Sequence, residues 1–337
     1  MHNSFFNLTL EERQLIISRA ADHMDVSDVV IEKDLWVCWL LEQLFTLPVR
    51  MVFKGGTSLS KVFNIIKRFS EDCDITIDYR DFAEKEIDLE KTSRSQLKKI
   101  SEQLKGQLKH YVHATVLPLL TEKLKNQFPE QKFEIILSED GETLEFYYPS
   151  IMTDSIVYLR DHVLIEFGIR NSTEPCEKHQ ILPYLTSSIG SDIGVPMPLI
   201  NTLSPIRTFW EKVTLIHVEC HRERLLQTPE RLSRHWYDLY MLNHSQIGDE
   251  ALERLDILES VLEYKRAFFH ASYANYDDCQ KGKLLLIPSS ENKEALSKDY
   301  AHMIDADMFY QTPPSFAEII VALESLESKI NQKVLAV

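Results

Sequence analysis

The stretch KGGTSLSKVFNIIKRFSEDCDITID, residues 54–78, predicts a strand, a glycine turn, a helix and a second strand in close succession. The apolar run Val49 to Phe53 is typical of a short β-strand, which Gly55-Gly56 ends. Ser58 to Lys67 has apolar residues at helical spacing. Cys73 to Asp78 alternates between polar and apolar residues, as a half-buried strand does. This order of elements predicts that the first part of the chain is built on a β-sheet.

The two glycines and the two hydroxyl residues after them point to a phosphate-binding turn. Gly55 and Gly56 let the backbone turn sharply and let a bulky anion come close. Thr57 and Ser58 lie at the start of the predicted helix, where free N–H groups and the helix dipole favour phosphate. Taken alone, GGTS is more typical of an ordinary strand-to-helix turn with a hydroxyl cap. The carboxylates that follow favour the phosphate interpretation.

Carboxylates follow on the second predicted strand. Residues two apart on a strand point to the same side, so Asp72 and Asp74 should project together, with Asp78 further along that face. Two adjacent carboxylates repel unless a cation lies between them, and Mg²⁺ is bound by one or two carboxylates together with phosphate oxygens. A third candidate, Glu166, lies in the predicted strand VLIEFGIR, residues 163–170. The alternative is a solvated strand edge, which is the commoner fate of an isolated pair.

The composition of the chain limits the classes of protein to which it can belong. The chain has 337 residues, of which 44% are hydrophobic, and a formal net charge of −15. Such a balance argues against a protein that coats nucleic acid non-specifically, although a local basic groove is compatible with it. The five cysteines lack C-x-x-C spacing, which predicts separate reduced thiols in a cytoplasmic protein. No run of apolar residues is long enough for a membrane helix, and the N-terminus does not resemble a signal peptide.

The pattern changes near residue 200. A stretch rich in Pro, Ser and Gly, residues 183–205, is typical of a linker, and four helical segments follow it: Ile206 to His221, Arg231 to Leu242, Leu252 to Phe269 and Ser315 to Asn331. We therefore expect an α+β fold with a mixed sheet and N-terminal helices in residues 1–200. An all-helical domain in residues 201–337 should follow.

The order of these features resembles the minimal nucleotidyltransferase core of the polymerase-β-like superfamily. More closely, the sequence resembles the AbiEii/AbiGii toxin family, which includes the MenT toxins. The resemblance runs over nearly the whole chain, in the stretches VIEKDLWV (30–37), FKGGTSLSKV (53–62), RFSEDCDI (68–75), VLIEFGIR (163–170), SPIRTFWEKVTLIHVECHR (204–222), RLSRHWYDLYML (231–242) and PPSFAEIIVALESLESKIN (313–331). Cys73 stands where an aliphatic residue is usual in the family, and a small thiol should pack inward there.

The resemblance implies a role for each matching position. The glycine-hydroxyl motif falls on Gly55, Gly56, Thr57 and Ser58, which are expected to hold a triphosphate, and Ser-x-Asp-x-Asp falls on Ser70, Asp72 and Asp74, the metal and nucleotide element. Lys212 is expected to contact the triphosphate. Asp238, in YDLY, is expected to act as general base or to activate the acceptor hydroxyl.

Without the resemblance, the residues of the second half have plainer interpretations. Lys212 would be a surface lysine, and Asp238 would pair with Arg234 one helical turn earlier. If Asp238 is catalytic, burial is expected to raise its pKa and suit it to proton abstraction. His217 and His221 have a spacing that can bind zinc, but no third ligand is evident.

Three basic residues of the opening stretch are also candidates for phosphate contacts. Lys54, Lys61 and Arg68 could each serve a phosphate or be solvated charges, and Arg68 is the best candidate among them. The run QLKKISEQLKGQLKH, residues 96–110, is most simply a solvated helix face.

The resulting hypothesis is an Mg²⁺-dependent nucleotidyltransferase toxin of a toxin–antitoxin or phage-defence (abortive infection) system. It would bind an NTP through Gly55 to Ser58, Ser70, Arg68 and Lys212, with two Mg²⁺ ions held by Asp72, Asp74 and Glu166. The resemblance implies transfer of NMP to an RNA acceptor, with the tRNA 3′ end expected, and a cognate antitoxin protein as partner. Two alternatives stay open: a catalytically silent binding module with this fold, and nucleotidylation of a protein hydroxyl.

Overall fold

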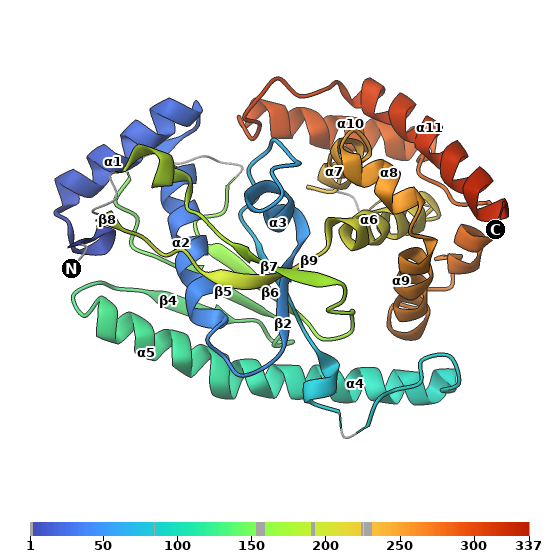
Figure 1. Cartoon of the computed structure of the whole chain (residues 1–337), viewed down its shortest axis with the longest axis horizontal. Coiled ribbons are helices and arrows are strands. Elements are labelled where there is room, and N and C mark those ends of the chain that lie inside the picture. The colour runs from blue at the N-terminus through green and yellow to red at the C-terminus, as the bar shows by residue number, and fades with distance from the viewer. Residues whose placement is uncertain are drawn as a thin grey trace. The chain divides into compact units, whose positions relative to one another are not determined.

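The computed structural model describes residues 3–83, 85–152, 159–189, 193–223, 225 and 231–336. The chain divides into two compact units (Figure 1). The first unit comprises Met1–Val62, Phe69–Lys85 and Glu102–Thr202, and the second comprises Phe63–Arg68, Glu86–Ser101 and Leu203–Val337. Within the described ranges, no helix combines the length and the apolar character needed to cross a lipid bilayer.

A mixed seven-stranded sheet is the centre of the first unit. Its strand order is β4-β5-β6-β3-β2-β9-β7, in which β3 pairs parallel with β6 and antiparallel with β2. The strands are β2 (Met51–Lys54), β3 (Cys73–Ile77), β4 (Glu134–Leu137), β5 (Thr143–Tyr147), β6 (Val163–Gly168), β7 (Cys176–Gln180) and β9 (Leu199–Leu203). The predicted mixed sheet is therefore confirmed. A separate parallel pair joins β1 (Asn3–Ser4) to β8 (Ile193–Gly194).

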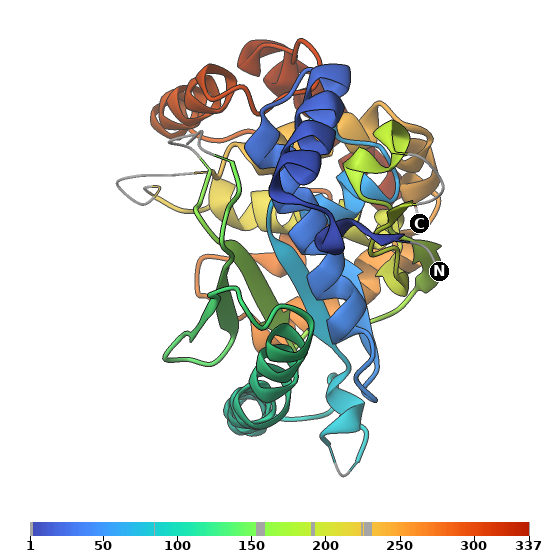
Figure 2. The ribbon, with the colours of Figure 1, turned by 90° about the vertical axis from the view of Figure 1, so that its left-hand side faces the viewer.

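Helices surround this sheet in the first unit. They are η1 (Phe5–Asn7), α1 (Leu10–Met24), α2 (Asp28–Leu44), α3 (Gly55–Lys61), η2 (Tyr79–Asp81), α5 (Leu117–Gln127) and η4 (Tyr184–Ser188). Helix α4 (Arg94–Tyr111) continues through the π-turn η3 (Val112–Val116) into α5, and its first eight residues are grouped with the second unit. Figure 2 shows α2 running alongside the strands, with α5 seen nearly end-on.

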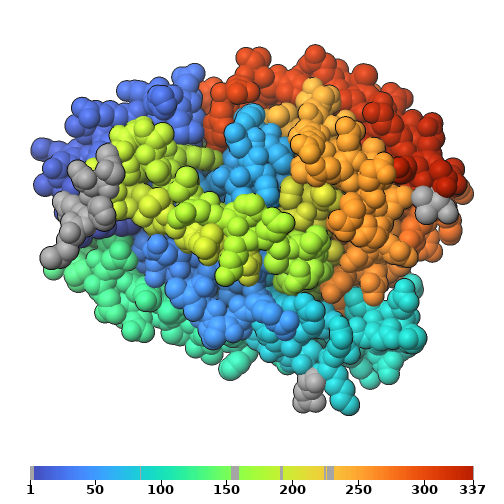
Figure 3. Space-filling model, in the orientation of Figure 1, coloured from blue at the N-terminus to red at the C-terminus, as the bar shows by residue number. Residues whose placement is uncertain are grey.

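The two faces of the sheet have different chemistry. Cys73, Ile75 and Ile77 of β3 are fully buried on one face, as expected for the thiol at Cys73. On this face the rings of Trp36 and Trp39 from α2 pack against Phe146 of β5, with centroids 5.7 and 6.2 Å apart. The opposite face of β3 carries the polar residues. The edge strand β7 is largely exposed and lies on the surface seen in Figure 3.

Helix α3 differs from the helix predicted over Ser58 to Lys67. It begins directly at Gly55 and ends at Lys61. Asn64 then adopts a φ of +50°. This left-handed conformation is one that Asn tolerates better than most residues, and it takes the chain off the helical path. Arg68 instead forms a β-bridge with Phe309 in the second unit.

The second unit is helical, as predicted. Its helices are α6 (Pro205–Cys220), α7 (Arg234–Asn243), α8 (Gln246–Leu252), α9 (Leu255–Phe268), η5 (Tyr276–Gln280), α10 (Ser290–Asp305) and α11 (Phe316–Leu335). Helix α6 contacts α7, α8 and α9, and α11 packs on α7. Trp210 and Trp236 are fully buried in the core of this unit. The fold class expected from the sequence, a mixed sheet followed by helices, is therefore the one observed.

Candidate active site

Charged residues from three neighbouring strands, β2, β3 and β6, form a row across the polar face of the sheet in the first unit. Asp74 of β3 is paired with Glu166 of β6 on one side and with Lys54 of β2 on the other. Side chains of directly paired residues point to the same face and lie about 5 Å apart at their Cβ atoms. Glu166 is exposed and Asp74 is half-buried. The strand acid and the second aspartate of the D-x-D motif are therefore immediate neighbours.

The glycine turn contacts the same aspartate. Gly55 has a φ of +77°, and a Cβ atom added to it would stand only 1.9 Å from Asp74 Oδ2. Glycine is required here for two reasons: the backbone is left-handed, and the Asp74 carboxylate occupies the space of a side chain. The glycine motif and the aspartate motif, nineteen positions apart in the sequence, thus come into contact. Gly56 follows as the second residue of α3.

The first prediction concerns this contact. Gly55→Ala should lower the free energy of unfolding by about 1–2 kcal/mol or more, because alanine is strained at this φ and its methyl group collides with Asp74. The matched control is Gly106→Ala in α4, where an added Cβ meets nothing within 4 Å and the helix should gain stability. Urea unfolding of both variants measures the difference. Equal stability of the two variants would contradict the contact.

The hydroxyls after the glycines tie the turn to the loop before β3. Thr57 donates a hydrogen bond to the main-chain oxygen of Asp72 at 2.6 Å, and its oxygen lies 3.0 Å from Ser70 Oγ. Ser58 donates to the Gly55 carbonyl at 2.9 Å. Both Thr57 and Ser58 are fully buried. The phosphate contacts expected of these hydroxyls stay predictions, and the observed bonds give Thr57 a further role, which is to hold Asp72.

The first aspartate of the motif lies in the loop that leads into β3. Asp72 is buried, and its Oδ1 lies 3.0 Å from Nη1 of Arg160. The predicted set of Asp72, Asp74 and Glu166 contains only carboxylate oxygens, which are the ligands that Mg²⁺ and Mn²⁺ prefer. Across the described ranges, however, no three His, Cys, Asp or Glu side chains come close enough together to hold a metal ion. In this arrangement Arg160 binds the Asp72 carboxylate, and the metal site stays a prediction.

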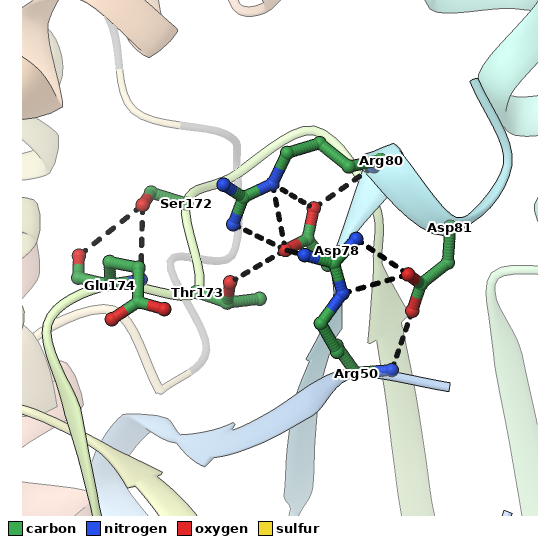
Figure 4. Close-up of polar contacts among 7 residues, drawn as sticks. All are labelled: Arg50, Asp78, Arg80, Asp81, Ser172, Thr173 and Glu174. Atoms are coloured by element: carbon green, nitrogen blue, oxygen red, sulfur yellow. Dashed lines mark hydrogen bonds and ion pairs between the residues drawn. The ribbon is translucent and has the colours of Figure 1, made fainter. Parts of the chain in front are cut away.

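The last acid of the same strand face has a different environment (Figure 4). Arg80 binds both oxygens of Asp78, through Nε at 2.8 and 3.0 Å and through Nη2 at 2.5 Å. Arg50 Nη1 lies 3.4 Å from Asp78, and the hydroxyl of Thr173 lies 3.3 Å away. Burial alone would raise the pKa of Asp78, but the hydrogen bonds and charges of the two arginines outweigh it and lower that pKa. Asp78 is thus a structural carboxylate.

The candidate residues of the second unit form a buried ion cluster. Both oxygens of Asp238 accept hydrogen bonds from Arg68, at 2.8 and 2.9 Å, and Lys212 Nζ donates to Oδ2 at 2.7 Å. Asp238 is 0%, Arg68 3% and Lys212 7% exposed. Lys212 is therefore not a surface lysine, and the main counter-ions of Asp238 include a residue far from it in sequence.

The pKa of Asp238 moves opposite to the direction expected from the sequence. Burial on its own raises this pKa, but the charges and hydrogen bonds of Arg68 and Lys212 outweigh burial and hold it well below its usual range. Burial also lowers the pKa of Lys212, with Asp238 acting in the other direction. A carboxylate held this way is a weak base, so the expectation of a raised pKa was wrong. The physical reason is the pair of cations that the sequence did not place beside it.

A second prediction follows from this cluster. Asp238→Asn should lower the free energy of unfolding at pH 7 by about 3 kcal/mol, because it leaves two buried cations without their anion. The folded pKa of Asp238 is depressed, so its stabilising contribution is present above the unfolded pKa of about 3.9 and is lost as the pH falls below it. Urea unfolding from pH 7 to pH 3 should show the gap between the two proteins narrowing as the pH falls below about 4. A gap that is constant or widens in acid would contradict this.

The two histidines considered for zinc are engaged within the second unit. His217 is fully buried; its Nδ1 accepts the N–H of Leu285 at 3.0 Å, and its Nε2 lies 3.1 Å from the Asn275 carbonyl. Burial lowers the pKa of His217 to about 4. Nδ1 of His221 lies 2.9 Å from the His217 carbonyl. Both ring nitrogens of His217 make contacts within the protein, so His217 is not placed to bind zinc as the spacing of the two histidines suggested.

Three consecutive charged residues on α2 were missed as functional candidates. Glu32, Lys33 and Asp34 are all buried. Glu32 accepts a hydrogen bond from the hydroxyl of Ser150 at 2.5 Å and one from the N–H of Ile151 at 2.8 Å. The signal in the sequence was three charges inside a run that is otherwise apolar. A helix buried on all sides can carry such charges only if each is paired.

The other two members of this trio anchor segments that lead to the carboxylate face. Lys33 Nζ lies 2.5 Å from Oε2 of Glu71, which is the residue directly before Asp72 in the chain. Asp34 forms an ion pair with Lys61, at the end of α3, and accepts the N–H of Tyr184 at 2.7 Å. Lys61 is therefore a buried structural cation. Helix α2 thus fixes both the glycine-turn helix and the loop that carries the first aspartate.

Residues 39–322 match the family described as nucleotidyl transferase AbiEii toxin, type IV toxin–antitoxin system. Among solved structures, the chain is similar to MenT4, a nucleotidyltransferase toxin from Mycobacterium tuberculosis H37Rv, with 16% sequence identity and a TM-score of 0.46 over 98% of this chain and 99% of that chain. The comparison with curated proteins gave no match.

Proposed function

Since the chain belongs to the AbiEii family of nucleotidyl transferase toxins of type IV toxin–antitoxin systems, we propose that it transfers NMP from an NTP to an RNA hydroxyl. The tRNA 3′ end is the proposed acceptor, the cytoplasm the proposed compartment, and a cognate antitoxin protein the proposed partner. The observation that carries the proposal is the contact between Gly55 and Asp74, with Glu166 beside Asp74 on the next strand. In this arrangement Asp74, which has an acidic neighbour in Glu166, lies directly against a residue without a side chain.

The reaction requires charge placement more than covalent chemistry. The acceptor oxygen forms a bond to the α-phosphorus, the bond from that phosphorus to the bridging oxygen breaks, the hydroxyl releases its proton to water, and pyrophosphate leaves. Asp74 and Asp72 are the proposed ligands of Mg²⁺, with Glu166 adjacent; the ion would neutralise the charge of the phosphate oxygens. Because Gly55 has no side chain, its backbone lies directly against the Asp74 carboxylate. Thr57 and Ser70 keep the Asp72 main chain in place.

The roles proposed for the second unit rest on the family resemblance. Lys212 would stabilise negative charge on the triphosphate, as a buried ammonium group can do strongly. Asp238 is better suited to hold Lys212 and Arg68 in position than to take a proton, since its carboxylate accepts from both and its pKa is lowered. We therefore propose Asp238 as a positioning residue, and Arg68 with it.

The experiment that tests the function uses the purified full chain with each α-labelled NTP and Mg²⁺. Total tRNA or a soluble protein extract is supplied as acceptor. Label that enters RNA supports the proposal, and label that enters protein would favour nucleotidylation of a protein hydroxyl. Absence of label with all four NTPs and both acceptors would overturn it in favour of a silent binding module. Growth arrest on expression of the wild type, but not of Asp74→Asn, provides the matching test in cells.

A further inference from the structure

In the ion pair between Arg160 and Asp72, the main chain of Arg160 is held in place while its guanidinium group is partly exposed. Arg160 Nη1 lies 3.0 Å from Asp72 Oδ1, and the side chains are 34% and 6% exposed respectively. The guanidinium therefore reaches a buried carboxylate from a position that water can enter. A guanidinium and a divalent cation are attracted to the same carboxylate by the same charge, so the two compete for it.

The backbone on both sides of this ion pair is held by one buried lysine. Lys33 Nζ lies 2.5 Å from Glu71 Oε2 and donates to the Arg160 carbonyl at 2.6 Å. The N–H of Arg160 lies 3.3 Å from the same Glu71 oxygen. Lys33 is fully buried. Lys33 and Glu71 thus fasten the main chain of Arg160 next to that of Asp72, whatever the Arg160 side chain does.

A comparison within the same strand face shows how a permanently paired acid is built. Asp78 receives Arg80 on both oxygens, the N–H of Arg80 at 2.9 Å, and Arg50 and Thr173 besides. Arg80 is only two residues away in the chain, so the pair is local. Arg160, in contrast, is brought to Asp72 from 88 residues away by the Lys33 anchor.

We propose that Arg160 is a positioning residue that occupies the cation's place at Asp72 and yields it when a divalent cation binds. The inference rests on the proposed function, in which Asp72 is a metal ligand. Before the ion arrives, the guanidinium keeps the Asp72 carboxylate ordered and offsets its charge. When the ion arrives, the half-exposed side chain can swing away while its main chain stays anchored. The Asp72 carboxylate is then already in place for the ion.

The test measures Mn²⁺ binding without nucleotide, by the loss of the free Mn²⁺ signal in electron paramagnetic resonance. Arg160→Gln should bind Mn²⁺ about tenfold more tightly than the wild type, because one competing positive charge is removed. Arg160→Lys keeps the charge and should stay close to the wild type. Arg80→Gln is the matched control: Arg80 is 38% exposed and also pairs with an aspartate of this strand face, but its removal should leave Mn²⁺ affinity unchanged.

Asp72→Asn separates the two possible failures. If Asp72→Asn weakens Mn²⁺ binding but Arg160→Gln leaves it unchanged or weaker, the inference about Arg160 fails and the metal site stands. If Asp72→Asn binds Mn²⁺ like the wild type, the proposed metal site fails and the inference falls with it. Circular dichroism and thermal unfolding of each variant confirm that affinities are compared between folded proteins. Arg160→Gln should fold, because Lys33 and Glu71 hold its main chain.

Discussion

Asp74→Asn should reduce nucleotide transfer at least about a thousandfold while leaving the fold intact. The amide keeps the size of the carboxylate, so the contact with Gly55 survives, but it removes the charge proposed to bind the cation. The stability change should be small because two effects oppose each other. Loss of the attraction to Lys54 destabilises the variant, and loss of the repulsion from Glu166 stabilises it. Each effect changes the free energy of unfolding by about 0.2–1 kcal/mol, the usual range for directly paired strand residues. Initial rates of label incorporation and urea unfolding measure the two quantities.

Asp78→Asn is the matched control for that result. It is the same substitution four residues further along the chain, which at the rise per residue of an extended strand is roughly 13 Å from Asp74. Asp78 is a structural carboxylate bound by Arg80, Arg50 and Thr173, so its variant should lose stability and keep its transfer rate per folded molecule. The two variants should therefore show opposite profiles. A transfer rate that Asp74→Asn leaves within tenfold of wild type, or that Asp78→Asn lowers equally, would refute the assignment of Asp74.

Sequence reasoning predicted the sheet-borne part of the candidate site because it depends on periodicity. The alternation of residues 73–77 fixes which of their side chains share a face, and the same rule places Glu166 opposite the apolar face of its strand. The alternation of residues does not show which other strand of the sheet pairs with a given strand. The parallel pairing of β3 with β6, which places Glu166 beside Asp74, joins segments about ninety residues apart and depends on the tertiary fold.

The features that were missed or misjudged share a different cause, which is long-range pairing of buried charge. Asp238 was expected to have a raised pKa because its sequence neighbours are apolar, but Arg68 reaches it from 170 residues away. Lys61 looked like a solvated or phosphate-binding cation and proved to be the buried partner of Asp34. Helix α3 is a separate case: it ends at Lys61 instead of the predicted Lys67, and Asn64 beyond it has a left-handed conformation.

The second large effect is expected in stability, at the lysine beneath the aspartate loop. Lys33→Met should lower the free energy of unfolding by about 3–5 kcal/mol, because it leaves the buried Glu71 carboxylate without its cation. The control is Lys105→Met, which removes an exposed lysine 3.8 Å from Glu102 and should cost less than about 1 kcal/mol. Chemical unfolding of both variants by urea gives the comparison.

The double variant Lys33→Met/Glu71→Gln shows whether that loss comes from the charge or from packing. Neutralising Glu71 removes the uncompensated carboxylate, so the double variant should recover a substantial part of the stability lost by Lys33→Met alone, and the coupling energy between the sites should exceed about 1 kcal/mol. Additive effects would mean that Lys33 stabilises the fold by filling space. The anchor assigned to Arg160 and Asp72 would then have to lie elsewhere. Strong coupling would instead mean that Lys33, buried on α2, carries its charge specifically to hold the aspartate loop in place.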